Sequence, residues 1–174
     1  MSNPISPDMV RHLKLVGEPS LSPDGSALAY ALSWVDEESM ESRSRVMMMN
    51  FTTESSPNKS GQGPVEFTQG YKDRAPKFSP SGDTLAFLRS SAEVPGQGDA
   101  KRQIWLMSAG GGEARQLTHE SGGVTELAWS PDSRQIAFCA DVEPAPSVEA
   151  NSMPQVKEVT RLRYRYDTLG WRGD

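Results

Sequence analysis

The sequence contains a single cysteine and only two histidines, which limits the chemistry that its side chains can perform. One cysteine can form neither an intrachain disulfide nor a cysteine-based metal cluster. Cys139 lies in the segment IAFCA, where strand alternation puts it on the same face as Ala137, so we expect a small buried core residue rather than a reactive thiol. Neither His12 nor His119 has a neighbouring pattern of nucleophile and orienting acid, so both are expected in surface or turn positions.

Long hydrophobic runs and an excess of positive charge are also absent. Hydrophobic residues make up 36% of the sequence, and no segment approaches the length of a transmembrane helix. The first residues, MSNPISPDMVRHLKLV, include no apolar run of signal-peptide length, which predicts a cytoplasmic protein with no membrane partner. The formal net charge of −5 argues against nucleic acid as a partner, because phosphate backbones attract basic proteins.

Motifs for catalysis and cofactor binding are missing as well. No G-x-S-x-G pentapeptide is present, so the chain itself is predicted not to be an enzyme. The glycines at 110–112 are followed by Glu113 instead of the Lys-Ser/Thr of a phosphate-binding loop, and a hairpin turn is expected there. The methionines at 47–49 are expected to fill core space in a strand, with a soft-metal site as the alternative. We predict no catalytic residue, no cofactor and no metal site in this chain.

One motif, in contrast, occurs three times. A hydrophobic residue and Ser-Pro lead into a turn and then into Leu/Ile-Ala-aromatic, as LSPDGSALAY, FSPSGDTLAF and WSPDSRQIAF. The serines of the motif, Ser22, Ser79 and Ser130, lie 57 and 51 residues apart. A strand–turn–strand unit that repeats every roughly 40–50 residues is typical of β-propeller blades. The 15 glycines and 13 prolines likewise favour many short strands joined by turns.

The second repeat predicts a complete four-stranded blade. Pro80 fixes φ in the turn at 79–82, and Gly82 suits the last position of that turn. From alternation and turn residues, the strands of this blade are expected at 76–79, 84–89, 103–108 and 113–117. The first blade is expected to have strands at 20–22, 27–34, 45–51 and 65–67. The third blade supplies a strand at 124–129 and a second strand, followed by a long polar loop at 143–155.

We therefore predict an all-β fold, a partial β-propeller of about two and a half four-stranded antiparallel blades preceded by a short N-terminal helix. The helix is expected from Pro7 to about Val16, because Ser-Pro-Asp at 6–8 has the pattern of a helix N-terminus. The lead-in covers 1–17, and the blades cover 18–72, 73–120 and 121–174, the last being the first part of blade 3 with a long insertion. A small alanine recurs between larger residues of each repeat and predicts close approach of neighbouring sheets: Ala29, Ala86 and Ala137.

Together these segments resemble the N-terminal propeller of the prolyl oligopeptidase family of serine peptidases, in its acylaminoacyl-peptidase or dipeptidyl-peptidase-like branch. The resemblance spans essentially the whole chain and rests on ISPDMVRHLKLVGEPSLSPDG, QIWLMSAGGGEARQLT, GGVTELAWSPDSRQIAF and RLRYRYDTLGW. The last of these is similar to a family insertion that usually closes with Asp-Gly-x-Gly-aromatic, and Thr168 replaces its first glycine. The resemblance implies a fragment whose propeller would, in the full-length protein, gate peptide access to a C-terminal α/β-hydrolase Ser-Asp-His site that this chain lacks.

Three arginines near the end of the chain are the candidate functional residues. Arg161, Arg163 and Arg165 alternate with Leu162, Tyr164 and Tyr166, which predicts a strand with one basic face. That basic face is either exposed to solvent on an outer strand or, following the resemblance, faces the substrate and attracts peptide carboxylates.

Other interpretations stay open for the whole chain. One alternative is a stand-alone propeller-type scaffold that binds protein partners, which is disfavoured because two and a half blades do not close a ring. Another is a TolB-like protein-interaction module, which is disfavoured because no signal peptide is expected. The partners expected are the rest of its own propeller, the hydrolase domain, and peptides in the parent enzyme. Self-association through open blade edges is also expected.

Overall fold

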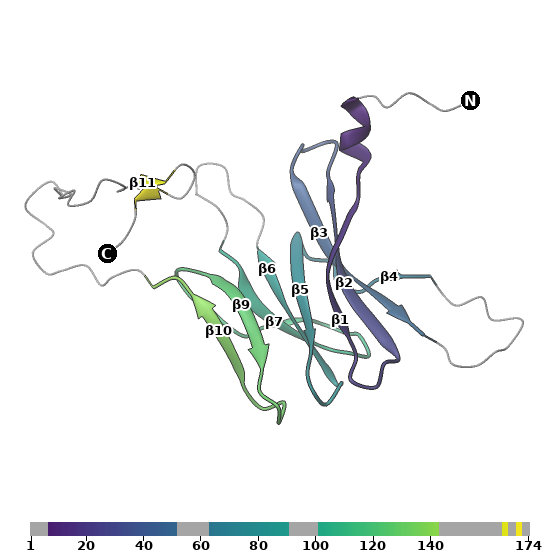
Figure 1. Ribbon diagram of the computed structural model, residues 1–174, viewed down its shortest axis with the longest axis vertical. Helices are drawn as coiled ribbons and strands as arrows, with labels where there is room; N and C mark the ends of the chain where they lie inside the picture. The colour runs from purple at the N-terminus through teal and green to yellow at the C-terminus, as the bar shows by residue number, and fades with distance from the viewer. Residues whose placement is uncertain (1–6, 52–62, 91–100, 143–164, 167–169, 172–174) are drawn as a thin grey trace, which may run out of the picture. The chain divides into compact units, whose positions relative to one another are not determined.

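The fold is seen in a computed structural model that describes residues 7–51, 63–90, 101–142, 165–166 and 170–171 (Figure 1). The chain divides into two units, Met1–Glu143 and Pro144–Asp174. Apart from one short 3₁₀-helix, every regular element described is a β-strand. This confirms the prediction of an all-β fold.

The first unit contains the strands of three blades. Blade 1 consists of β1 (Leu15–Leu21), β2 (Ala27–Val35), β3 (Ser42–Asn50) and β4 (Val65–Glu66). Blade 2 consists of β5 (Lys72–Phe78), β6 (Thr84–Ser90), β7 (Gln103–Ser108) and β8 (Arg115–Gln116). Blade 3 contributes β9 (Val124–Trp129) and β10 (Ile136–Ala140). The second unit contains a short hairpin of β11 (Arg165–Tyr166) and β12 (Gly170–Trp171).

Strands within each blade pair antiparallel, in chain order. A single parallel bridge between Ser44 of β3 and Lys72 of β5 links blades 1 and 2 into one hydrogen-bonded path, β1-β2-β3-β5-β6-β7-β8, with β4 on the side of β3. The predicted strands 103–108 and 124–129 coincide with β7 and β9. The blade boundaries at 17/18, 72/73 and 120/121 stay a prediction.

The N-terminal helix differs from the prediction. The structure has a six-residue 3₁₀-helix, η1, over Pro7–His12, and Leu15 already begins β1. Val16, expected in the helix, pairs with Leu32 of β2 instead. Helical spacing of a few apolar residues is a weak signal, and here the backbone hydrogen bonds available along the edge of β2 outweigh it.

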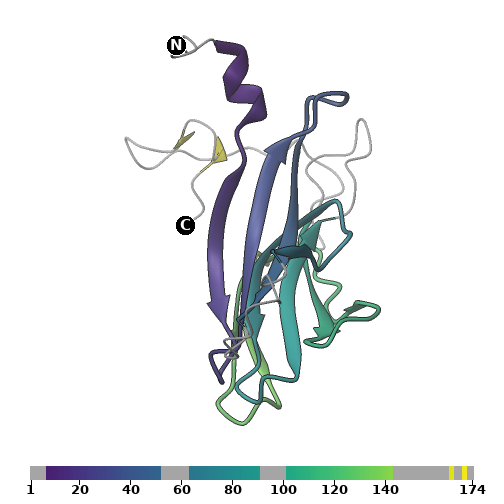
Figure 2. The same cartoon turned by 90° about the vertical axis from the view of Figure 1, so that its right-hand side faces the viewer.

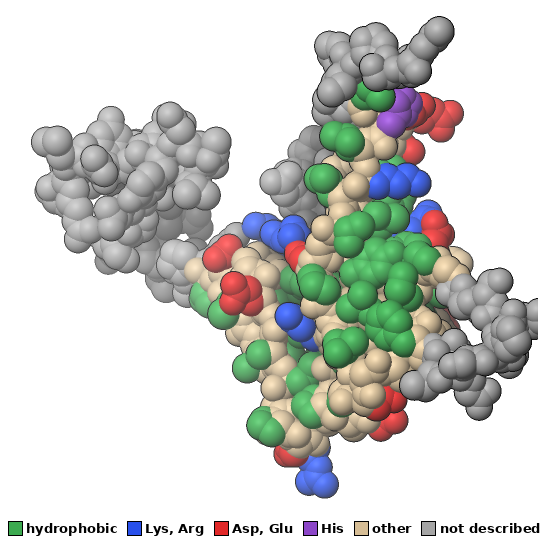
Figure 3. Space-filling model, turned by 45° about the vertical axis from the view of Figure 1, so that its right-hand side comes forward, with side chains coloured by type: hydrophobic (Ala, Val, Ile, Leu, Met, Phe, Trp, Pro, Cys, Tyr) green, Lys and Arg blue, Asp and Glu red, His purple; other side chains and the backbone are tan. Residues whose placement is uncertain are grey.

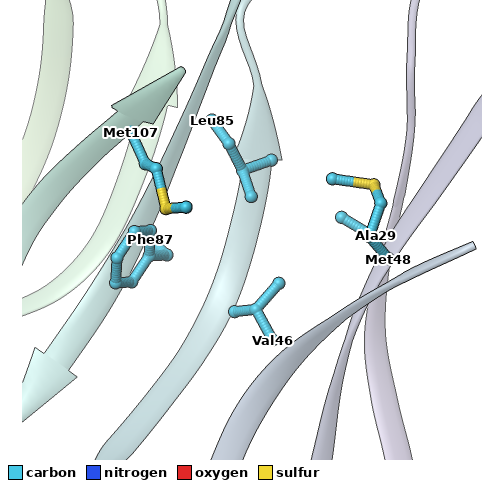
Figure 4. Close-up of a cluster of buried hydrophobic side chains, with 6 residues drawn as sticks. All are labelled: Ala29, Val46, Met48, Leu85, Phe87 and Met107. Carbon is cyan, nitrogen blue, oxygen red and sulfur yellow. The ribbon is translucent and has the colours of Figure 1, made fainter. Parts of the chain in front are cut away.

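Two apolar clusters lie between neighbouring blades. The first lies between blades 1 and 2 and consists of Ala29, Val46, Met48, Leu85, Phe87 and Met107 (Figure 4). The second lies between blades 2 and 3 and consists of Ala86, Leu88, Ile104, Leu106, Val124 and Leu127. Blade 2 therefore uses alternate residues of β6 on its two faces, as strand geometry requires. Met47 and Met48 are both buried, which confirms the expected core role of the methionine run.

The predicted burial of Cys139 is wrong. Ala29 and Ala86 are fully buried between blades, as expected of the repeated alanine, whereas Ala137 and Cys139 are exposed. The physical reason is that β10 pairs only with β9, and no further described strand covers its outer face. Other large hydrophobic side chains are also exposed, notably Leu15 and Val16 of β1. Figure 3 shows hydrophobic side chains gathered over one face of the described part of the chain.

The Ser-Pro turns have the same hydrogen bonds in all three blades. In blade 1, Ser22 N donates to Ala27 O at 2.8 Å, and Ala27 N donates back to Ser22 Oγ at 2.8 Å. Ser79 and Ser130 close the other two turns in the same way. The three turns lie at one end of the blades, opposite η1 (Figures 1 and 2). Gly82 in the second turn has φ of 82°, which confirms the predicted need for glycine.

Thr68 and Thr118 make the same side-chain contact with the third strand of their blades, and the sequence pattern did not predict it. Thr68 Oγ1 accepts a hydrogen bond from Val46 N at 3.1 Å, and Thr118 Oγ1 accepts one from Ile104 N at 2.9 Å. Both threonines are buried, and both follow the fourth strand of their blade. Each hydroxyl therefore satisfies a backbone donor of the third strand where the fourth strand has ended.

Candidate functional site

A cleft between blades 1 and 2 is the strongest candidate site in the described residues. It encloses about 400 Å³ and lies at the end of the blades opposite the Ser-Pro turns. Its walls come from both blades and consist of Leu15, Val16, Gly17, Glu18, Ala31, Ser33, Ser42, Ser44, Lys72, Arg74, Ser90 and Arg102. A concave site of this size that carries several polar groups has the usual dimensions of a small ligand site.

An ion pair between the two inner strands forms one wall of this cleft. Arg74 of β5 donates from Nε at 3.0 Å and from Nη2 at 2.5 Å to Oε1 of Glu18 in β1. Oε2 of Glu18 accepts a hydrogen bond from Ala75 N at 2.7 Å. The carboxylate of blade 1 therefore binds both a side chain and the backbone of blade 2, and it fixes the spacing of the two inner strands.

Backbone irregularities explain how Glu18 reaches its partners. The pairing of β1 with β2 shifts between Gly17 and Ser20, and the pairing of β5 with β6 shifts between Arg74 and Lys77. Glu18 and Ala75 occupy these two bulges, with positive φ of 54° and 50°. Positive φ is uncommon for residues other than glycine, and bulges re-aim side chains and leave backbone groups without a ladder partner. Here the free amide of one bulge is bound by the side chain of the other.

The charge state of Glu18 follows from these contacts. Desolvation by burial raises its pKa, but the hydrogen bonds from Arg74 and Ala75, with the nearby charges of Arg74 and Arg102, outweigh it and hold the pKa below its ordinary value. Glu18 is therefore ionised at neutral pH.

A second ion pair supports blade 2 behind the cleft. Asp73 is fully buried and accepts hydrogen bonds from Arg89 Nε at 2.7 Å and from Arg89 Nη2 at 2.9 Å. Gly70 N donates to the same carboxylate at 3.0 Å. The Arg89 guanidinium also lies 4.7 Å from the centre of the Trp105 ring. This bidentate ion pair between Asp73 and Arg89 fixes the start of β5, the strand that contributes Lys72 and Arg74 to the cleft.

The side chains of the three arginines predicted from the sequence lie outside the part of the chain that the structure describes. Arg161 and Arg163 lie outside the described residues. Arg165 begins β11, where its backbone is paired with Trp171, and its side chain also lies outside the described part. Their role as substrate-facing residues stays a prediction.

The histidines and the glycine run lie as expected. His119 is exposed, and His12 is largely exposed, with its Nδ1 3.0 Å from Oε1 of Glu37. Gly111 N donates to Ser108 O at 2.9 Å, and Gly111 and Gly112 have positive φ, which confirms the turn. Nothing in the sequence pattern pointed to Glu18 as an inter-blade residue. The only available signal was the 57-residue repeat, which aligns Glu18 with Ala75.

Comparison with known proteins identifies the fold family. The sequence matches the TolB beta propeller domain over residues 8–168. The chain belongs to the TolB beta propeller domain family. No helix in the described part of this propeller chain is both long enough and apolar enough to cross a membrane.

Curated relatives of this propeller chain are peptidases. It is 33% identical over 177 residues to the uncharacterized peptidase YuxL of Bacillus subtilis, a match that covers 98% of this chain and 25% of YuxL. It is 22% identical over 171 residues to dipeptidyl-peptidase 5 of Porphyromonas endodontalis, covering 95% of this chain and 22% of that protein. The chain thus spans about a quarter of the length of these relatives.

Solved structures share the fold. Acylaminoacyl peptidase of Pyrococcus horikoshii superposes with a TM-score of 0.62 at 16% identity, over 94% of this chain and 22% of that one. A putative TolB of Agrobacterium tumefaciens superposes with a TM-score of 0.51 at 21% identity, over 71% of this chain and 38% of that one. At these identities the likeness concerns the propeller fold alone.

Proposed function

We propose that this chain is the non-catalytic N-terminal propeller portion of a serine peptidase. In the full-length protein, the propeller restricts peptide access to a C-terminal α/β-hydrolase domain with a Ser-Asp-His site. The observation that carries the proposal is the match to YuxL, which extends over 98% of this chain but only 25% of a protein described as a peptidase. A propeller at this place in a peptidase is suited to screening substrates before they reach the catalytic site.

The cleft between blades 1 and 2 supports this role. Its lining includes the inner strands β1 and β5, which are the strands that border the central channel of a propeller. Peptides that pass along the channel would meet the polar groups of this cleft. Screening by shape and charge requires no catalytic residue in the propeller itself.

The test begins with the gene. Sequencing the locus beyond the codon for Asp174 should find further blades and then a G-x-S-x-G motif, an Asp and a His. The full-length protein should react with a fluorophosphonate probe for activated serines, whereas the 174-residue chain alone should not. A stop codon without a downstream hydrolase, or labelling of the isolated chain, would contradict the proposal.

The gating part of the proposal needs a separate measurement. Full-length protein should hydrolyse short peptides and leave long or folded substrates of the same cleavage sequence intact. The kcat/KM values for a length series of peptides measure this directly. Equal values across the series would show that the propeller does not screen substrates.

A second candidate function is a propeller-type module that binds protein partners, as in the alternative drawn from the sequence. The structural likeness to the putative TolB of Agrobacterium tumefaciens is the observation in its favour. The locus sequence separates the two candidates, because only the peptidase proposal requires a hydrolase domain downstream.

A further inference from the structure

The face of blade 3 that points away from blade 2 is exposed. Leu127 of β9 is buried against blade 2, so the pleat of the strand directs the residues on either side of it to the opposite face. Strand pairing adds two residues of β10 to that face, because Ala137 lies opposite Ala128 and Cys139 lies opposite Glu126. These four residues form the far face of blade 3, and all four are exposed.

The repeated alanine indicates that this face suits a covering sheet. Ala29 and Ala86 hold the equivalent position in blades 1 and 2, and both are fully buried in the cluster that meets the next blade. Ala137 holds the same position in blade 3, where none of the described strands follows. A small side chain here lets a neighbouring sheet approach closely, so blade 3 presents the same shape that blades 1 and 2 present to their neighbours.

Glu126 adds a negative charge to the far face of blade 3. It lies four residues before the serine of the third Ser-Pro motif, which is the position that Glu18 holds before the first. Glu126 is not among the residues with positive φ, so its direction follows from the pleat of β9 and not from a bulge residue like Glu18. Its carboxylate has no hydrogen bond or ion pair within the described part of the chain, and it can bind a group on a neighbouring blade.

A cation on one blade accompanies a carboxylate on the blade before it. Arg74, which binds Glu18, lies five residues before the serine of the second motif. The residue of blade 2 that is equivalent to Glu18 is Ala75, which has no carboxylate. Blade 3 correspondingly has Thr125, and not a cation, five residues before its serine. The carboxylate of Glu126 therefore indicates a cation at this position of the next blade.

We propose that the far face of blade 3 docks the first hairpin of a fourth blade, encoded beyond Asp174, and that Glu126 binds an arginine or lysine five residues before the serine of that blade's Ser-Pro motif. The match to YuxL covers 25% of that protein, which leaves length for further blades. The inference rests on the proposed function only through continuation of the propeller, and it does not require the hydrolase domain.

Alkylation of Cys139 in the full-length protein measures whether this face is covered. Native protein is treated with N-ethylmaleimide, and mass spectrometry follows labelling of the peptide that contains Cys139, with urea-unfolded protein as the reference. A fourth blade should slow the labelling at least about a hundredfold, because a buried thiol reacts only when the blades open. The control is Glu113→Cys, at an exposed position just before β8, which should be labelled at nearly the unfolded rate.

The outcomes separate this inference from the proposed function. Rapid labelling of native Cys139 would overturn the inference even if a hydrolase domain is present. Protection that disappears on dilution would also overturn it, because the face would then be covered by a second copy of the protein. Further blades without a hydrolase domain would contradict the proposed function alone, and a gene that ends at Asp174 would contradict both.

Substitutions test the charge pair itself. Glu126→Gln should speed labelling of Cys139 by roughly fivefold, the scale of one partly solvated ion pair, whereas the matched control Glu113→Gln should leave the rate unchanged. Replacing the cation of the fourth blade by Gln should have the same effect, and the double variant should be labelled no faster than either single variant. An uncharged residue at that position in the gene, or additive effects of the two substitutions, would overturn the pairing.

Discussion

Gly70 occupies a position where the chain has no room for a side-chain atom. An added β-carbon would overlap the Asp73 carboxylate and the Arg89 guanidinium. Because Asp73 is fully buried, separating it from Arg89 leaves an unpaired charge in the protein interior. We expect Gly70→Ala to lower the free energy of unfolding by about 3 kcal/mol in urea denaturation followed by tryptophan fluorescence.

The matched control for this prediction is Gly110→Ala. An added β-carbon at Gly110 would lie 3.6 Å from Ser108 Oγ, an ordinary contact distance, and Gly110 is not among the residues with positive φ. Its substitution should change stability little. If both variants unfold at the same urea concentration as the parent protein, the Asp73 pair does not depend on Gly70.

Asp24 in the first Ser-Pro turn makes stability depend on pH. Its carboxylate accepts hydrogen bonds from Ser22 Oγ and from Ser26 N and Oγ, which lower the pKa of Asp24 to about 2. Since the folded pKa lies below the unfolded value, the contribution is complete above about pH 4 and is lost as the pH falls through about 2. Melting temperatures measured across this window should fall with pH, and less steeply in Asp24→Ala.

Asp83→Ala provides a comparison for that measurement. Asp83 is an exposed aspartate beside the second Ser-Pro turn, but its side chain is not part of the hydrogen-bonded turn. This variant should keep the pH dependence of the parent protein between about pH 4 and pH 2. Identical slopes for the two variants would remove Asp24 as the cause.

At the scale of the elements, the contact between β1 and β5 depends on Glu18. Glu18→Gln keeps the shape of the side chain but removes the charge that attracts Arg74. The pair is partly solvated, with exposed side-chain fractions of 47% for Arg74 and 32% for Glu18, so the expected loss is only about 1 kcal/mol. Urea denaturation measures it, and Glu113→Gln, at an exposed position just before β8, is the control. A loss no larger than that of the control would mean that the pair does not hold the blades together.

The sequence predicts most of these strands because their signals are local. The Ser-Pro turns and the alternation in residues 84–89 and 103–108 each depend on a few neighbouring residues, and the structure confirms them. Local spacing predicts a helix at Val16, whereas its strand pairing with Leu32 depends on a distant segment of the chain. Tertiary pairing of this kind is not encoded in local periodicity.

The candidate cleft is harder to predict for the same reason. Glu18 and Arg74 are 56 residues apart, and they meet only because two bulges bring adjacent inner strands together. Cys139 shows that a correctly predicted strand does not by itself determine which of its side chains are buried. Alternation correctly identifies its strand, but burial also requires a covering sheet, and none of the described strands covers β10.

At the scale of the whole molecule, exposed apolar side chains on the first and last described blades affect behaviour in solution. Leu15 and Val16 of β1 are 67% and 69% exposed, and Phe138 of β10 is 41% exposed. Open strand edges and apolar faces promote association between molecules. We therefore expect the isolated 174-residue chain to be weakly stable or self-associating in sedimentation velocity and thermal melting experiments.

A substitution tests whether blade 3 contributes to that association. Phe138→Glu places a charge on the exposed face of β10 and should shift the sedimentation profile toward the monomer. Phe51→Glu, at another exposed position just after β3, is the control and should shift it less. A monodisperse monomer with a sharp cooperative melt for the unmodified chain would contradict the expectation.

The Ser-Pro turns also bear on how the protein is made. Each turn closes on itself over a separation of five residues, as in the bond from Ala27 N to Ser22 Oγ. Hairpins with such local contacts form quickly and without help from distant parts of the chain. We therefore expect blade hairpins to form one after another as the chain leaves the ribosome, from the N-terminus onward. Each newly synthesised blade then meets the apolar face of its predecessor already in place, as a template for its own packing.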